Sequence, residues 1–146
     1  ETLTYCGTSI TDGIGLRGIK MIEDWNRFPN FAKEEFQCSH CGREDMDADF
    51  VEALQDLRTT YGRTLTVSSG FRCPEHPVEA RKTGGAGSHA SGRAADLAVS
   101  RADAIKVLRI ALSDERFRGF GIQQKWAGRF IHLDSLEKNR PAIWSY

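Results

Sequence analysis

The most constraining feature of the sequence is a long stretch, from Gly70 to about Arg93, that lacks both helical and strand periodicity. Connections of this length are uncommon in a compact domain and are usually functional. The run GGAG at residues 84–87 adds glycines that favour turns. Residues 64–69 alternate as a half-buried strand does, and residues 94–99 form a second strand-like segment. We therefore predict two strands joined by a functional loop.

Two helices are predicted, one before and one after these strands. Asp49 and Glu52 form a capping box, and apolar residues then recur at helical spacing up to Gly62. Ser100 and Asp103 form a second capping box ahead of another amphipathic run. Each pattern is typical of a helix that buries one stripe of side chains against a core.

The last third of the chain adds two more strand-like segments, residues 120–124 and 129–135, which predict a hairpin. Because strands and isolated helices follow one another without a regular βαβ rhythm, we predict an α+β fold with a small, mostly antiparallel sheet and flanking helices. Residues 1–29 are expected to form an extension packed on a domain of residues 30–146. The part of this extension between Cys6 and Gly18 is rich in Gly, Ser and Thr and predicts turns.

Composition excludes several classes of protein. The length of 146 residues and the hydrophobic fraction of 40% are those of one ordinary globular domain, which we expect to be a monomer. Twenty Lys and Arg residues balance twenty Asp and Glu residues, so no net charge favours nucleic acid as a partner. No apolar run is long enough for a membrane span, and no signal peptide is expected in this chain.

Two histidines and a carboxylate form a candidate metal site. His89 lies in the long loop, Asp96 follows on the second strand, and His132 and Asp134 share one face of the last predicted strand. Two imidazoles and one carboxylate leave a fourth position for water, as in catalytic zinc sites. A single histidine before a strand is more often a surface residue than a ligand. The small residues between His89 and Asp96, Gly92 among them, favour the metal site because they allow close approach of the backbone.

Four segments carry a resemblance to a known family. HASGRAAD at residues 89–96 has the pattern His-x-x-Gly-x-Ala-x-Asp of the zinc D-Ala-D-Ala carboxypeptidases, a group that includes phage L-Ala-D-Glu endopeptidases and the hedgehog signalling domain. SGFR at residues 69–72, FQCSHCG at residues 36–42, and IHLD with the tail NRPAIWSY are similar to other segments of that group. Together they extend the resemblance over about residues 30–146 and imply a hedgehog or DD-peptidase-like fold.

The resemblance implies a site and an activity. His89, Asp96 and His132 are expected to bind Zn2+, and Arg72 to hold a substrate carbonyl oxygen or terminal carboxylate. Outside the resemblance, an ordinary surface arginine is the favoured interpretation of Arg72, since arginines are mostly exposed. Bound zinc would polarise the scissile carbonyl and lower the pKa of its water. The expected substrate is a peptidoglycan stem peptide, cut by a carboxypeptidase or by an L-Ala-D-Glu endopeptidase of the phage endolysin type.

The sequence departs from the family pattern at two positions. Many members carry Glu or Asp three residues before the last zinc histidine as general base, whereas this chain has Arg129, which cannot accept a proton. Asp134 is the substitute candidate, either as the base or as the partner that orients His132. The serine of the family two residues before the first ligand is replaced by Gly87, with Ser88 next to it.

The cysteines raise a separate question. Cys38 and Cys41 form a CxxC pair, and Cys73 with His76 forms a CxxH pair. These four residues could close around a structural zinc. A disulfide from Cys38 or Cys41 to Cys73 is the favoured alternative if the protein works in an oxidising compartment, and buried unpaired thiols are a third.

Two further functions remain open from the sequence. A zinc-containing binding module without activity would explain Arg129, and a phage structural component could carry the same domain. A wall hydrolase would be secreted, periplasmic or delivered to the cell wall by a phage.

Overall fold

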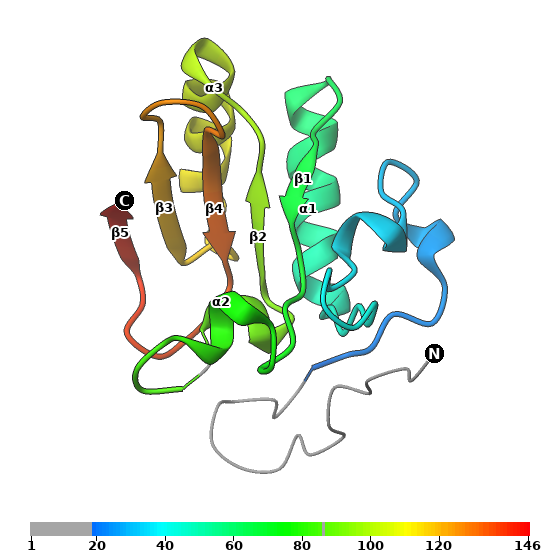
Figure 1. Cartoon of the computed structure of the whole chain (residues 1–146). Coiled ribbons are helices and arrows are strands. Elements are labelled where there is room, and N and C mark those ends of the chain that lie inside the picture. Colours follow the sequence, from blue (N-terminus) through cyan, green and yellow to red (C-terminus); the bar gives the residue numbers. More distant parts are fainter. Residues whose placement is uncertain (1–18, 86) are drawn as a thin grey trace.

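A computed structural model describes residues 19–85 and 87–146 (Figure 1). The predicted turns between Cys6 and Gly18 lie outside these residues. Three short 3-10 helices occur in this part of the chain, at Trp25–Arg27, Lys33–Phe36 and Ser88–Ser91. The remaining elements are the helices α1 (Ala48–Tyr61), α2 (Pro77–Ala80) and α3 (Arg101–Leu112), and the strands β1 (Val67–Ser69), β2 (Ala94–Leu97), β3 (Gly119–Gln123), β4 (Phe130–Asp134) and β5 (Ala142–Ser145).

The five strands form one sheet in the order β1-β2-β4-β3-β5. The first three pairings are antiparallel, and β5 adds to β3 in parallel. Helices α1 and α3 lie behind the sheet in the view of Figure 1, and α2 lies near one end of it. The predicted α+β class with a mostly antiparallel sheet is therefore confirmed, and the parallel edge strand β5 is an addition that the sequence patterns did not predict.

The start of α1 differs from the prediction. Its N-cap is Asp47, whose carboxylate accepts a hydrogen bond from the backbone N–H of Phe50 at 3.2 Å. The same carboxylate accepts from the backbone N–H of Lys20 at 2.9 Å. The capping box of Asp49 and Glu52 is therefore wrong by two residues, because a contact distant in sequence holds Asp47 at the cap. The predicted end at Gly62 is correct, since Gly62 adopts a left-handed φ of 75°.

The predicted capping box of α3 is also wrong. Ser100 occupies the N-cap position, but its side chain makes no capping hydrogen bond. Asp103 instead accepts from Arg63 at 2.7 Å. An ion pair with Arg63, two residues after the end of α1, takes the place of the local pairing.

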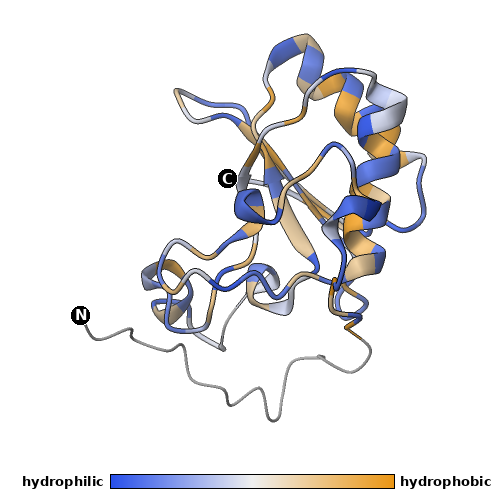
Figure 2. Ribbon diagram, turned by 90° about the vertical axis from the view of Figure 1, so that its right-hand side faces the viewer, coloured by the Kyte–Doolittle hydropathy of each residue, from blue (hydrophilic) through white to orange (hydrophobic). Residues whose placement is uncertain are grey.

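The core lies between the sheet and the two long helices. Phe50 and Leu54 of α1 pack in the same buried cluster as Leu97 of β2 and Leu133 of β4. Figure 2 shows hydrophobic segments both in the strands and in the helices that cover them. Phe28 belongs to this cluster as well, so residues before position 30 contribute to the core. None of the helices in the described part of the chain has the length and apolar character of a membrane span.

The long predicted loop is partly ordered into short helices. Helix α2 and the 3-10 helix Ser88–Ser91 lie within residues 70–93. His76 caps α2, and its Nδ1 accepts from the backbone N–H of Val78 at 3.1 Å. Gly92 ends the 3-10 helix Ser88–Ser91 with a φ of 74°. A Cβ at this position would collide with the carbonyl oxygen of Asp45. Only glycine fits this turn into β2.

Candidate metal centre

Neighbouring elements bring His89, Asp96 and His132 together. Asp96 on β2 and His132 on β4 are direct partners across the antiparallel pair. The turn at Gly92 places His89 above them, with its ring centre 5.1 Å from that of His132. One ligand atom of each residue lies within 4.8 Å of those of the other two, and all three side chains are buried. The spacing of a metal site is therefore present at the position that the sequence predicts.

The contacts select one nitrogen of each imidazole to face Asp96. Nε2 of His89 lies 3.3 Å from Oδ1 of Asp96, and Nδ1 of His132 lies 3.0 Å from the same oxygen. Nδ1 of His89 lies 2.8 Å from the carbonyl oxygen of Gly70, an atom that can only accept. Nδ1 of His89 therefore donates to Gly70, and Nε2 is the nitrogen that faces the centre.

Hydrogen bonds and neighbouring charges together outweigh burial in setting the pKa values of Asp96 and His132. Burial alone would raise the pKa of Asp96, but the hydrogen bonds and charges of His132 and His89 lower it far below its usual range. Burial would likewise lower the pKa of His132, yet the hydrogen bonds with Asp134 and Asp96 raise it. The contacts of both imidazoles with Oδ1 of Asp96 hold the three side chains together.

Asp134 supports His132 from the side opposite Asp96. Its Oδ2 lies 2.9 Å from Nε2 of His132, and Arg140 donates to both of its oxygens at 2.9 and 2.8 Å. The side chain of Asp134 is 0% exposed. Burial by itself raises the pKa of Asp134, but the hydrogen bonds from His132 and Arg140 lower it to about 2. Asp134 thus lies against a candidate ligand rather than at the open side of the cluster.

The C-terminal tail closes this side of the centre. The ring of Trp144 on β5 lies tilted beside that of His132, with the ring centres 5.1 Å apart, and the Arg140 guanidinium lies 5.1 Å from the centre of the Trp144 ring. Sequence reasoning did not identify Arg140 or Trp144 as site residues. Gly119 and Gly121 of β3 leave space for site side chains, because a Cβ at Gly119 would collide with the carboxylate of Asp134 and one at Gly121 would lie 2.8 Å from Trp144 Nε1. Two glycines alternating on one strand are the signal that could have indicated this close packing.

Arg72 lies beside the cluster and is not an ordinary surface residue. Its Nη2 lies 3.4 Å from Oδ2 of Asp96, its Nη1 donates to Glu79 at 3.1 Å, and its Nε donates to Ser69 at 3.0 Å. Only 18% of its side chain is exposed. Arg72 is therefore held at the edge of the centre by partners on both sides.

Glu79 is a buried carboxylate that sequence reasoning missed. Besides Arg72, it accepts from Lys82 at 2.9 Å and from the backbone N–H of Gly87 at 2.6 Å. Burial by itself raises the pKa of Glu79, and the bonds from Lys82, Gly87 and Arg72 outweigh it and lower the pKa. Gly87, which stands in place of the serine of the family, thus binds Glu79 through its backbone, and Ser88 follows as the first residue of the 3-10 helix.

Arg129 lies in the turn between β3 and β4. Its Nε donates to the carbonyl oxygen of Trp126 at 3.0 Å. It lines a hollow formed with residues of α3, among them Ala104 and Leu108. Position 129 therefore supplies no carboxylate that could act as a general base at the cluster.

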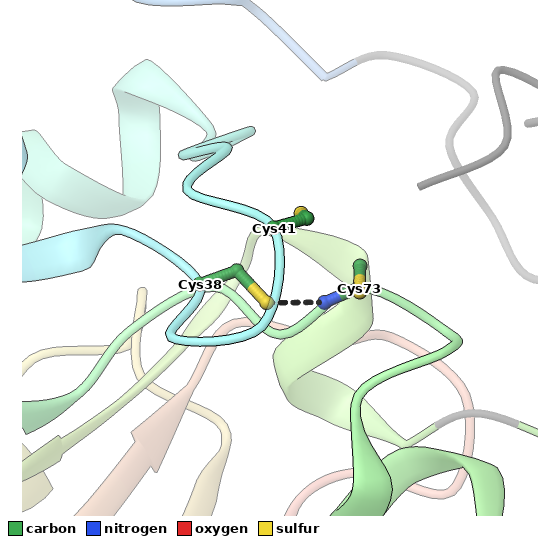
Figure 3. Close-up of side chains that lie close together, drawn as sticks. All are labelled: Cys38, Cys41 and Cys73. Atoms are coloured by element: carbon green, nitrogen blue, oxygen red, sulfur yellow. Dashed lines mark hydrogen bonds between the residues drawn. The ribbon is translucent and has the colours of Figure 1, made fainter. Parts of the chain in front are cut away.

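The described cysteines gather in a second cluster. The sulfurs of Cys38, Cys41 and Cys73 all lie within 4.8 Å of one another, and no disulfide joins them (Figure 3). Burial by itself raises the pKa of Cys38, but backbone N–H groups of Cys73, Cys41 and His40 lower it overall. Neither His76, expected as the fourth member, nor His40 belongs to this group of three, and Nε2 of His76 lies 3.0 Å from Ser39 Oγ.

Comparisons with known proteins agree with this arrangement. The model of the family described as peptidase M15 matches residues 29–134, which include both clusters. No curated protein and no solved structure matches the chain.

Proposed function

The chain belongs to the peptidase M15 family, whose members are metallopeptidases, and from this premise we propose that it is a zinc-dependent peptidoglycan hydrolase that cuts stem peptides beside a D-amino acid. The observation that carries the proposal is the convergence of His89, Asp96 and His132 at one buried point. A hydrolase of this kind acts on the cell wall, after secretion, in the periplasm or by phage delivery.

The donor set fits zinc. Two imidazole nitrogens and one carboxylate oxygen are ligands that Zn2+ accepts, and three protein ligands leave a position for water or substrate. The bonds of His89 to Gly70 and of His132 to Asp134 orient each ring, as outer partners of metal-binding histidines do. When bound, zinc supplies a Lewis acid and a water of lowered pKa.

Arg72 is proposed as the residue that holds the substrate. Its guanidinium reaches the edge of the cluster through Asp96, and Glu79 fixes it from the other side. A fixed, planar cation at this place suits the oxygen of a scissile carbonyl or a terminal carboxylate. Removing such a donor typically costs a few kcal/mol of transition-state stabilisation.

Asp134 is proposed as a positioning residue rather than as the general base. Both of its oxygens are engaged by Arg140, and it meets His132 on the nitrogen that faces away from Asp96. A base must reach the water from which it takes a proton. The contacts of Asp134 favour a role in orienting the imidazole and keeping its Nδ1 directed at the metal.

The proposal is tested by measuring zinc content and cleavage of purified peptidoglycan. We expect His89→Ala to lose the zinc of this site and all measurable cleavage. His76→Ala is the matched control, because it removes an imidazole outside the site. Equal cleavage by the native chain and His89→Ala would eliminate the metal mechanism. Mass spectrometry of the products distinguishes a carboxypeptidase, which releases free D-Ala, from an L-Ala-D-Glu endopeptidase of the endolysin type.

A second candidate is a zinc-containing binding module, including one in a phage structural component. Arg129 favours it, because that position supplies no base and its side chain lies over α3. Full zinc occupancy with saturable binding of muropeptides and no turnover would support this candidate over the hydrolase.

A further inference from the structure

The cysteine cluster joins two segments that are far apart in the sequence. Cys38 and Cys41 lie on the turn after the 3-10 helix Lys33–Phe36, whereas Cys73 follows β1 and lies next to Arg72. Figure 3 shows the three side chains around one point, with Cys38 directed at the backbone of Cys73. Cys38 and Cys73 are 2% and 0% exposed. Three sulfurs within 4.8 Å of one another, from two buried cysteines and the half-buried Cys41, have the arrangement of a metal site.

The backbone around Cys38 forms a tight turn, and the backbone N–H of Cys73 points at the Cys38 sulfur. The N–H of Cys38 donates to the carbonyl oxygen of Arg43 and the N–H of Gly42 to that of Cys38, both at 2.7 Å. Gly42 adopts a φ of 77°, which suits glycine. The N–H of Cys73 donates to Sγ of Cys38 at 3.3 Å. Such bonds stabilise a thiolate, the form in which cysteine binds metal.

We propose that Cys38, Cys41 and Cys73 bind a structural zinc ion, separate from the catalytic centre, with His40 as the fourth ligand. Nδ1 of His40 lies 3.3 Å from Sγ of Cys73. His76 is engaged instead at both ring nitrogens, by Ser39 and by the N-terminus of α2. A set of three thiolates and one imidazole is a common structural zinc site, and soft thiolates select zinc over magnesium or calcium.

The ion would fix the segment that presents Arg72. The N–H of Phe71 donates to the carbonyl oxygen of Phe36 at 2.9 Å, and Gly70 is so close to Phe36 that a Cβ would collide with its backbone. The hydrogen bond from the N–H of Cys73 to the sulfur of Cys38 joins the same two segments at a second place. Residues 36–41 and 70–73 are thereby held as one unit next to the catalytic centre.

The test uses cobalt and metal analysis, which need no substrate. In the native chain we expect about two zinc ions, and about one in His89→Ala, which lacks only the first site. Cobalt added to metal-free His89→Ala should give the near-ultraviolet absorption of cobalt–thiolate bonds. Cys38→Ser in the same background should abolish that absorption. If the Cys38 variant does not fold, the spectrum of His89→Ala alone decides.

Single variants identify the fourth ligand. His40→Ala should weaken cobalt binding at the cluster at least about tenfold, and the control His76→Ala should leave it unchanged. Absence of the thiolate absorption, or an intact mass lowered by the hydrogens lost in a disulfide, would overturn the site. Loss of the ion in His76→Ala or Cys6→Ser, with His40→Ala unaffected, would overturn the assignment of His40. Because none of these readouts is peptidase activity, they can succeed even if the chain hydrolyses nothing.

Discussion

The role of Asp134 depends on the residues that contact it. A strand pattern places it on the face of His132, which allows both a base and an orienting partner. The bonds from Arg140 and its complete burial favour the second role. The choice between the two roles depends on the contact with Arg140. The alternating pattern of the strand does not predict this contact, because Arg140 lies beyond the strand.

Replacing Asp134 by Asn should weaken zinc binding about 10- to 100-fold, the usual effect of losing an outer partner of a metal ligand. The amide keeps the shape but loses the charge that supports His132 and pairs with Arg140. Competition with a chelator measures the affinity. Asp114→Asn, at a surface pair with Arg116, is the control. An unchanged zinc affinity in Asp134→Asn would remove the positioning role.

The lowered pKa of Asp134 predicts an acid-sensitive contribution to the stability of the metal-free protein. Its pKa is about 2 in the folded chain and about 3.9 in an unfolded one. A depressed folded-state pKa stabilises the fold above the unfolded value, and the contribution is lost as the pH falls through the folded value. Urea unfolding at several pH values should therefore show the gap between native and Asp134→Asn narrowing from about pH 4 to about pH 2. A gap independent of pH would contradict this assignment.

Gly121 should not tolerate a methyl group. A Cβ there would lie 2.8 Å from Trp144 Nε1 and 2.9 Å from His132 Cβ. Overpacking of this kind typically costs about 1–3 kcal/mol in the free energy of unfolding. Gly87→Ala is the control, since its Cβ would meet chiefly the flexible end of Lys82. Equal stability of the two variants in denaturant unfolding would show that Trp144 does not pack on His132 as described.

Among the elements, the segment of residues 70–93 differs most from its prediction as an irregular loop. The sequence predicts its length and function, and the structure adds α2, the 3-10 helix Ser88–Ser91 and the buried carboxylate of Glu79. Glu79 carries no periodic signal, because its partners Arg72, Lys82 and Gly87 come from different parts of the loop. Loop residues of this kind are identified only by their contacts.

If Glu79 positions Arg72, Glu79→Gln should lower kcat/KM about tenfold or more without changing the zinc content. The neutral amide removes the buried charge that pairs with the Arg72 guanidinium, so Arg72 is held less firmly. Steady-state kinetics on a muropeptide substrate should separate the effect on kcat from that on KM. Glu75→Gln, an exposed carboxylate on the same loop, is the control. A variant with native kinetics would show that Glu79 only stabilises the loop.

In the whole molecule, the centre lies where the sheet meets its longest loop. Asp96 and His132 come from adjacent central strands, and the helices α1 and α3 cover the sheet from behind. Because two of the three candidate ligands lie on strands, which move little, we expect zinc binding to stabilise the folded chain.

Removal of zinc should therefore lower the melting temperature and abolish peptidase activity, and added zinc should restore both. At a free zinc concentration of 100 times Kd, one site stabilises the fold by about 2.7 kcal/mol. Differential scanning calorimetry with and without chelator measures the shift, and His89→Ala should show a smaller one. A melting temperature unaffected by chelation would contradict zinc binding at either cluster.

The sequence by itself determined the two long helices, four of the strands and the types of candidate donor. Periodicity located two helices and four of the five strands, since alternation and helical spacing are local properties of the chain. The resemblance carried by the motif HASGRAAD, together with the alternation of the last strand, identified the candidate donors His89, Asp96 and His132. Tertiary structure decided the parallel strand β5, the cap at Asp47, the pairing of Arg140 with Asp134 and the position of His40 instead of His76 beside Cys73. These depend on contacts between residues distant in sequence, whose energies are set by which surfaces meet when the core closes.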